Sequence, residues 1–160
     1  MKEILKELDE LTAKLNERDE ELRRSEELLS KFFEESGVPM AFFDVSQEKF
    51  IKVNEALSKA IEYSKEELLS YHVIHFLFNK DSMEDALKRI EYRKQNPDVT
   101  IPPTVVRYRK KSGDEIWLRW HFFKSSTPNI YHSIAIDVTH EVHLQARVEE
   151  LEKELSILKK

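Results

Sequence analysis

The sequence contains no cysteine among its 160 residues. This absence excludes disulfide bonds, thiolate metal sites and cysteine nucleophiles, and it agrees with a reducing compartment. The chain also lacks any run of about 18 apolar residues, and its N-terminus has no apolar signal-peptide core. We therefore expect a soluble, cytoplasmic chain with no membrane span.

A broad basic surface of the kind that binds nucleic acid is also missing. The formal net charge is −5, and residues 1–35 account for it with 7 Lys+Arg against 12 Asp+Glu. The one basic cluster is small and is expected at the edge of a hairpin; it comprises Arg107, Arg109, Lys110 and Lys111. We expect no nucleic-acid partner.

Residue sets that carry catalysis are scarce. No Ser/His/Asp set, paired-carboxylate set or phosphate loop stands out, so we expect a chain that is not an enzyme. Two His-x-x-His pairs, His72/His75 and His140/His143, could bind a divalent metal at helical spacing. No Asp, Glu or Cys at a suitable local spacing completes either set. Solvated or capping histidines are the preferred interpretation, and no metal site is predicted.

The sequence does have two apolar stripes at the spacing of a coiled coil. In the first, Met1 and four leucines lie seven residues apart, and Ile4, Leu11, Arg18, Ser25 and Phe32 fill the intervening position. We call the five leucines of this stripe the seam leucines: Leu8, Leu11, Leu15, Leu22 and Leu29. In the second, the C-terminal stripe, apolar residues alternate four and three apart: Leu144, Val148, Leu151, Leu155 and Leu158.

An average spacing of 3.5 residues favours packing against a partner helix. We predict a parallel coiled-coil homodimer, with an intramolecular helical hairpin as the alternative for the first stripe. The polar seam residues Arg18 and Ser25 weaken association but can fix its register. The predicted organisation is an N-terminal coiled-coil helix over 1–35, a globular domain over 36–138 and a C-terminal signalling helix over 139–160.

The centre of the chain alternates between strand and helix patterns. Apolar or alternating segments predict strands at 40–45, 50–53, 104–111, 115–124 and 130–138. Between the second and third of these, Asn54 can cap a helix over 55–61, and Ser64 and Glu67 form a capping box. Asp81 or Ser82 can cap a longer helix that ends near residue 95. The predicted fold is α+β, with a five-stranded antiparallel sheet and short helices.

These segments resemble a PAS domain. The similarity rests on residues 53–56 (VNEA), 63–69 (YSKEELL), 107–113 (RYRKKSG), 116–118 (IWL) and 137–139 (DVT). It covers roughly residues 30–143. Glu62 and Ser70 stand where many members of the family have glycine. The resemblance implies a sheet wrapped by short helices around a small-molecule pocket and joined to helices that control an output domain.

The resemblance also implies pocket and junction residues. By similarity to light-sensing members, Leu118, Trp120 and Phe122 face inward, and Leu87 and Ile90 join them from the preceding helix. A core filled by side chains without a ligand is the alternative. Asp137 and Thr139 would anchor the junction between the last strand and the C-terminal helix. Signals would then pass along the C-terminal stripe.

Cofactor expectations follow from the same resemblance. The flavin-cysteinyl photochemistry of light-sensing members requires a cysteine, so the lack of one excludes it. Haem sensors carry a proximal histidine on the helix before the fourth strand; residues 82–95 contain none, and only His72 and His75 lie just ahead. His140-Glu141 resembles the phospho-acceptor box of sensor histidine kinases, but the proline of that box is missing.

The sequence therefore predicts a dimeric PAS sensor or signal-relay module of a bacterial-type signalling protein, such as a two-component system. Ligand- or partner-induced changes would pass through the coiled coils to an output domain beyond residue 160. The alternatives are a dimerisation scaffold with a filled core and a haem-binding sensor. The ligand, the output domain and the direction of signalling are left open by the sequence.

Overall fold

A computed structural model describes residues 1–158, which form two compact units that divide after Ser36. The first unit is one helix, α1 (Lys2–Glu35). Its Leu, Glu, Lys and Arg residues have high helix propensity, and ion pairs one turn apart join neighbouring charges, as between Arg23 Nη1 and Glu27 Oε1 at 2.7 Å. The seam leucines are each 58–64% exposed in the single chain. The coiled coil itself stays a prediction.

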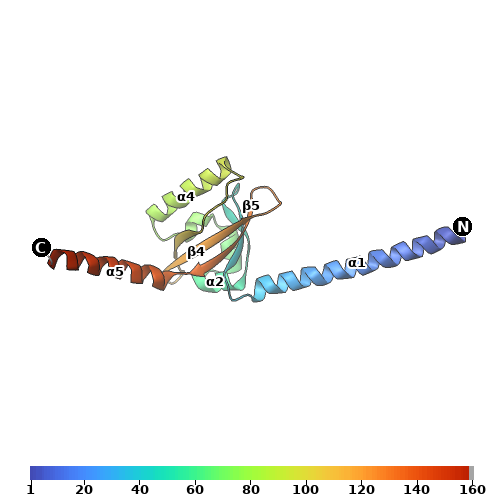
Figure 1. The fold of residues 1–160 in the computed structure, drawn as a ribbon, viewed down its shortest axis with the longest axis horizontal. Helices are drawn as coiled ribbons and strands as arrows, with labels where there is room; N and C mark the ends of the chain where they lie inside the picture. The colour runs from blue at the N-terminus through green and yellow to red at the C-terminus, as the bar shows by residue number, and fades with distance from the viewer. Residues whose placement is uncertain (159–160) are drawn as a thin grey trace. The chain divides into compact units, whose positions relative to one another are not determined.

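The second unit contains one antiparallel sheet of five strands in the order β2-β1-β5-β4-β3 (Figure 1). The strands are β1 (Met40–Asp44), β2 (Lys49–Val53), β3 (Thr104–Arg109), β4 (Glu115–Lys124) and β5 (Ile130–Asp137). This confirms the predicted fold class and all five strands. The third strand stops at Arg109 because a tight turn follows, in which Gly113 donates to the Lys110 carbonyl at 2.9 Å and adopts φ +100.

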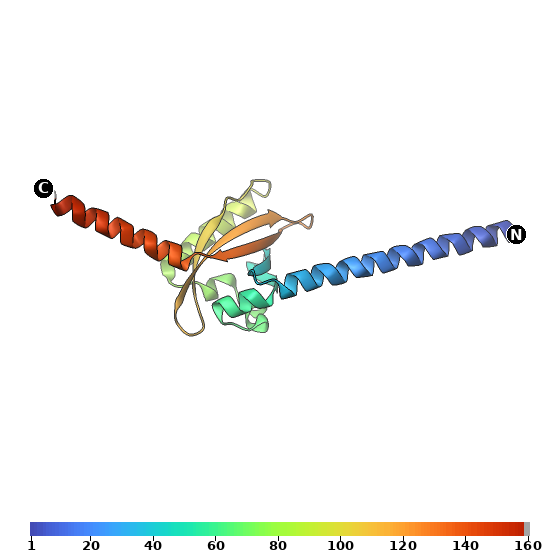
Figure 2. The ribbon, with the colours of Figure 1, turned by 60° about the horizontal axis from the view of Figure 1, so that its bottom comes forward.

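Four helical segments connect β2 to β3 (Figures 1 and 2). They are α2 (Glu55–Ile61), α3 (Lys65–Ser70), the 3-10 helix η1 (Val73–Phe76) and α4 (Lys80–Gln95). The predicted capping box is present, since the Glu67 amide donates to Ser64 Oγ at 3.2 Å and Glu67 Oε2 accepts from the Ser64 amide at 2.8 Å. The predicted cap of α4 was wrong by two or three residues, because Asn79 caps the helix and accepts from the Ser82 amide at 3.0 Å.

Asn54 joins the start of the sheet to α2. Its side chain is fully buried and accepts hydrogen bonds from the Met40 amide at 2.9 Å and the Leu57 amide at 3.1 Å. Its amide group donates to the Val38 carbonyl at 2.9 Å. A buried polar side chain is tolerated here because several backbone groups satisfy it.

The core lies between the sheet and the helical segments. Alternation along β4 buries Ile116, Leu118 and Trp120, as the period of a strand requires. Trp120 and Phe76 are 1% and 0% exposed. An aromatic side chain of this size contributes about 4–6 kcal/mol at most when it leaves water. Trp120 and Phe76 are therefore among the largest single contributors to the stability of the second unit.

Helix α5 (Thr139–Leu158) continues directly from the end of β5 (Figures 1 and 2). Its C-terminal stripe is 41–82% exposed in the single chain, and its partner stays a prediction. No helix within residues 1–158 is both long and apolar enough to cross a membrane.

Candidate functional site

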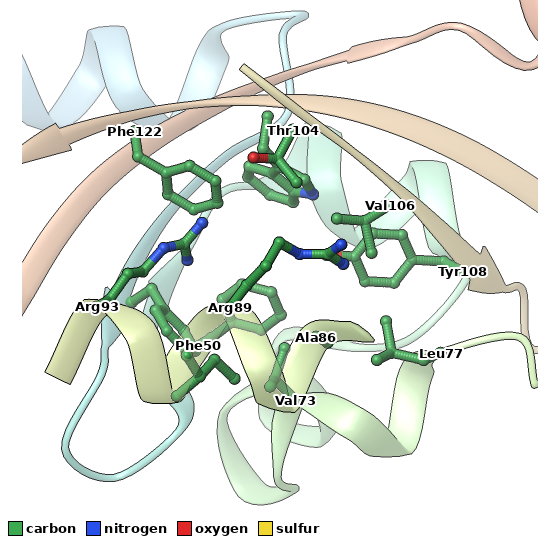
Figure 3. A pocket seen from close by; sticks show the side chains of 13 residues that line it. Phe50, Val73, Leu77, Ala86, Arg89, Arg93, Thr104, Val106, Tyr108 and Phe122 are labelled. Carbon is green, nitrogen blue, oxygen red and sulfur yellow. The ribbon is translucent and has the colours of Figure 1, made fainter. Parts of the chain in front are cut away.

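A small cavity lies between the inner face of the sheet and α4 (Figure 3). Its volume is about 50 Å³, which corresponds to one or two water molecules. The lining comes from both strands and helices and includes Phe50, Ala86, Ile90, Val106, Tyr108, Trp120 and Phe122. The cavity is therefore mostly filled by side chains, with space for only a very small group.

The predicted pocket residues divide into three groups. Ile90, Trp120 and Phe122 line the cavity. Leu118 is fully buried in the core but is not part of the lining. Leu87 departs from the prediction, because it lies on the outer side of α4 and is 39% exposed. Helical periodicity turns residues 86, 90 and 93 toward the sheet and leaves 87 outside.

Aromatic rings form one wall of the cavity. Trp120 stacks with Phe122 at a centroid distance of 6.1 Å and lies 6.1 Å from Phe50 and 6.4 Å from Tyr108. Burial raises the pKa of Tyr108, so its hydroxyl stays neutral at physiological pH. This wall of the cavity is therefore aromatic and uncharged.

Two arginines from α4 complete the lining, and the sequence prediction missed both. The Arg93 side chain is 8% exposed, and its guanidinium lies 4.0 Å from the centre of the Phe122 ring. Desolvation, with a smaller contribution from Arg89, lowers the pKa of Arg93 to about 10, so it stays protonated at neutral pH. Figure 3 shows the Arg93 side chain pointing toward Phe122 and the Arg89 side chain reaching toward Tyr108.

A larger groove adjoins the cavity on the outer side of these arginines. Its volume is about 410 Å³, and it shares Arg89, Arg93 and Thr104 with the cavity. The rest of its lining comes from α4 and the segment before β3: Lys88, Tyr92, Asn96, Val99, Thr100, Ile101 and Pro102. The groove contains three cationic side chains and no carboxylate.

The junction between β5 and α5 is held by hydrogen bonds to β4. The Trp117 amide donates to Thr139 Oγ1 at 2.9 Å, and the Trp117 carbonyl accepts from the Val138 amide at 2.8 Å. Asp137 Oδ1 accepts from the Thr139 amide at 2.9 Å and from its hydroxyl at 2.6 Å. Asp137 and Thr139 thus lie at the first turn of α5, where the prediction placed them.

Side-chain contacts extend the junction along α5. Arg119 pairs with Glu141 at 2.5 Å, and His143 Nε2 lies 2.6 Å from Glu115 Oε1. Burial alone would raise the pKa of Glu115, but its contacts with His143 and Arg107 hold that pKa below its ordinary value. Glu115 is therefore an anionic contact between β4 and the second turn of α5.

The remaining predicted histidines lie apart from the cavity. His72 Nε2 is 2.5 Å from Glu48 Oε2, and His75 stacks on Tyr71 at 4.4 Å. His140 is exposed in the first turn of α5. Within residues 1–158, no three His, Cys, Asp or Glu side chains are grouped so that they could hold a metal ion.

Comparison with known proteins identifies the fold. No protein-family model and no curated protein sequence matches the chain. Among solved structures, the PAS domain of an HTR-like protein from Haloarcula marismortui aligns with a TM-score of 0.60 and 17% identity, over 76% of this chain and 98% of that one. A domain of a sensory box sensor histidine kinase/response regulator from Geobacter sulfurreducens gives 0.59 and 17%, over 72% and 96%.

A third structure extends the likeness to a light receptor. An RNA-binding Light-Oxygen-Voltage receptor aligns with a TM-score of 0.64 and 18% identity, over 79% of this chain and 36% of that one. Identities this low carry information on the fold alone. The TM-scores and the shares of the chain that align show that the chain has the fold of a PAS domain.

Proposed function

We propose that the chain is a dimeric PAS sensory or signal-relay module without catalytic activity of its own. Changes in the cavity or at a partner surface would pass through α5 to an output domain. The observation that supports this most directly is the role of β4. This strand lines the cavity through Trp120 and Phe122 and, through Trp117, holds the start of α5.

The distance along β4 is short. Trp120 follows Trp117 by three positions, which corresponds to about 10 Å of strand. Both segments lie in a tightly packed sheet, and packed interfaces shift between discrete arrangements rather than deforming smoothly. A change in how Trp120 packs is therefore expected to alter the hydrogen bonds at Trp117 and, through them, the pitch or register of α5.

The exposed stripes on the two long helices support the dimeric part of the proposal. The seam leucines and the C-terminal stripe each leave a continuous apolar row in water, and rows of this kind mark interaction surfaces. Pairing with a second copy would bury both rows at the coiled-coil spacing. Each of the two helices would form its own two-stranded coil with the same helix of the second copy.

The test uses cross-linking of introduced cysteines, for which the chain has no native background. Leu144→Cys and Leu151→Cys report on the start and the middle of α5. Ala86→Leu fills the cavity from α4 and stands in for an occupied site, and Asp85→Leu is the matched control on the exposed side of the same helix. We expect Ala86→Leu to change the ratio of the two cross-links and Asp85→Leu to leave it as in the parent.

The same cross-linking ratio in all three proteins would refute signalling through α5.

A second candidate function, an interaction scaffold with a filled core, is favoured by the small volume of the cavity. Native mass spectrometry of the freshly purified chain separates the two, since a bound extra mass supports the sensor and a bare dimer supports the scaffold. A Soret absorption band would instead support the haem-binding alternative, although no histidine lines the cavity.

A further inference from the structure

We propose that the cavity and the adjoining groove form one binding site for a small organic carboxylate, with its charged group held by Arg89 and Arg93. We call these two residues the arginine pair. The inference rests on the proposed sensory function and adds the chemical class of the ligand. Its apolar body would lie in the groove, between α4 and the segment that precedes β3.

The first argument is the unpaired charge of Arg93. The side chain is more than nine-tenths buried and faces the cavity, yet no carboxylate within residues 1–158 pairs with it. A buried cation without a counter-ion is costly to fold. The Phe122 ring and the C-terminal end of α4 offset part of this cost, but neither supplies an acceptor for the planar fork of guanidinium N–H donors.

The second argument is the presence of further positive charges near Arg93. Arg89 lies one turn earlier on α4, is half-buried, and also has no ion pair in the described part of the chain; its charge contributes to the lowered pKa of Arg93. Lys88 adds a third cation at the rim. A local charge of +3 without a carboxylate stands out in a chain whose net charge is −5. The field of this cluster attracts anions.

The third argument concerns size and polarity. The groove volume of about 410 Å³ lies within the range of small-molecule sites, which is roughly 300–1,000 Å³. Tyr92, Val99, Ile101 and Pro102 give it an apolar wall that suits a hydrocarbon or aromatic body. The site therefore offers donors and apolar surface, and a carboxylate provides the missing acceptors.

The experiment is isothermal titration calorimetry on the full chain with 3-phenylpropanoate and with its neutral isostere, 3-phenylpropanamide. We expect the acid to bind and the amide to bind about tenfold more weakly, because the amide cannot form charge-assisted hydrogen bonds. Arg93→Gln and Arg89→Gln should each lower the affinity for the acid by about tenfold and leave the affinity for the amide unchanged. Lys80→Gln, a charge-matched control at the other end of α4, should change neither.

Circular dichroism checks that each variant is folded. If Arg93→Gln does not fold, Arg93→Lys is used in its place. Lysine keeps the charge but loses the bidentate fork, so it should bind the acid with intermediate affinity. Equal binding of acid and amide, no saturable binding of the acid, or unchanged acid binding in both glutamine variants would overturn the proposal.

The outcomes also separate this inference from the proposed function. If the amide binds as tightly as the acid and still changes the cross-linking of α5, the ligand class is wrong and the sensory role stands. If the acid binds through the arginine pair and the cross-links do not change, the site is real and signalling through α5 is refuted.

Discussion

Thr139→Val removes the hydroxyl that connects β4 to α5 without a large change in side-chain volume. The last residue of β5, Asp137, pairs with Leu118, so Trp117 has no strand residue opposite it on that side. The Thr139 hydroxyl and the Val138 amide take over its backbone hydrogen bonds. The variant therefore deprives the half-buried Trp117 amide of its acceptor.

The expected loss of stability can be worked from this contact. Leaving a buried or half-buried donor without an acceptor costs about 1–2 kcal/mol. For a folded unit of this size the cost corresponds to a fall in Tm of roughly 4–8 °C. Thr139→Ser keeps the hydroxyl and loses only a methyl group, so its Tm should lie much closer to that of the parent.

Two measurements check the reasoning: thermal unfolding followed by circular dichroism, and hydrogen exchange of the Trp117 amide. We expect faster exchange at Trp117 in Thr139→Val and parent-like exchange in Thr139→Ser. Equal melting of the two variants, or unchanged protection of Trp117 in Thr139→Val, would show that the hydroxyl does not hold the junction.

Three further predictions concern other parts of the chain. Asn54→Ala should lower the free energy of unfolding in urea by about 2–4 kcal/mol, because three backbone groups lose a buried partner; Asn54→Asp, which keeps the acceptor, should lose less. The hydrogen bond from Lys94 lowers the pKa of Glu48, so the stability that Glu48→Gln removes is present above the ordinary glutamate pKa and should fall as the pH drops through the lower folded-state pKa. A difference in urea titrations that does not shrink as the pH is lowered would contradict this. Leu22→Glu should lower the affinity of the dimer by about 100-fold or more in sedimentation experiments, because it places a charge in the seam of each helix. Arg23→Glu, on the outer face, should leave the affinity unchanged. Equal sedimentation of the two variants would count against the coiled coil.

Local signals in the sequence were strong where one physical rule decided the outcome. Period-two alternation and the turn at Gly113 predicted the strands, and the Ser64/Glu67 pair predicted the start of α3. The start of α4 was harder because Asn79, Asp81 and Ser82 are all good capping residues. Just before that helix, Leu77 forms a β-bridge with Tyr108. This contact joins segments that are distant in the sequence, so local patterns do not predict it.

The arginine pair was missed for a related reason. Arginines near the end of a helix ordinarily face water and interact with the helix dipole, and nothing local marks Arg93 as buried. Its position three residues after Ile90 and seven after Ala86 is the one signal that could have found it. The same periodicity explains why Leu87, an apolar residue, lies outside.

The position of Arg93 makes the two proposals parts of one mechanism. Arg93 lines both the cavity of about 50 Å³ and the groove of about 410 Å³, and its guanidinium lies against Phe122, two residues from Trp120 on β4. A carboxylate that binds Arg93 from the groove competes with the Phe122 ring for the same cation. A ligand shifts a two-state equilibrium only by its differential affinity, and a change from 1:10 to 10:1 requires about 100-fold. Under the proposals, exchanging one cation–π contact for charge-assisted hydrogen bonds would supply part of that differential affinity, and a carboxylate at Arg93 is therefore expected to bias the packing of Phe122 and β4.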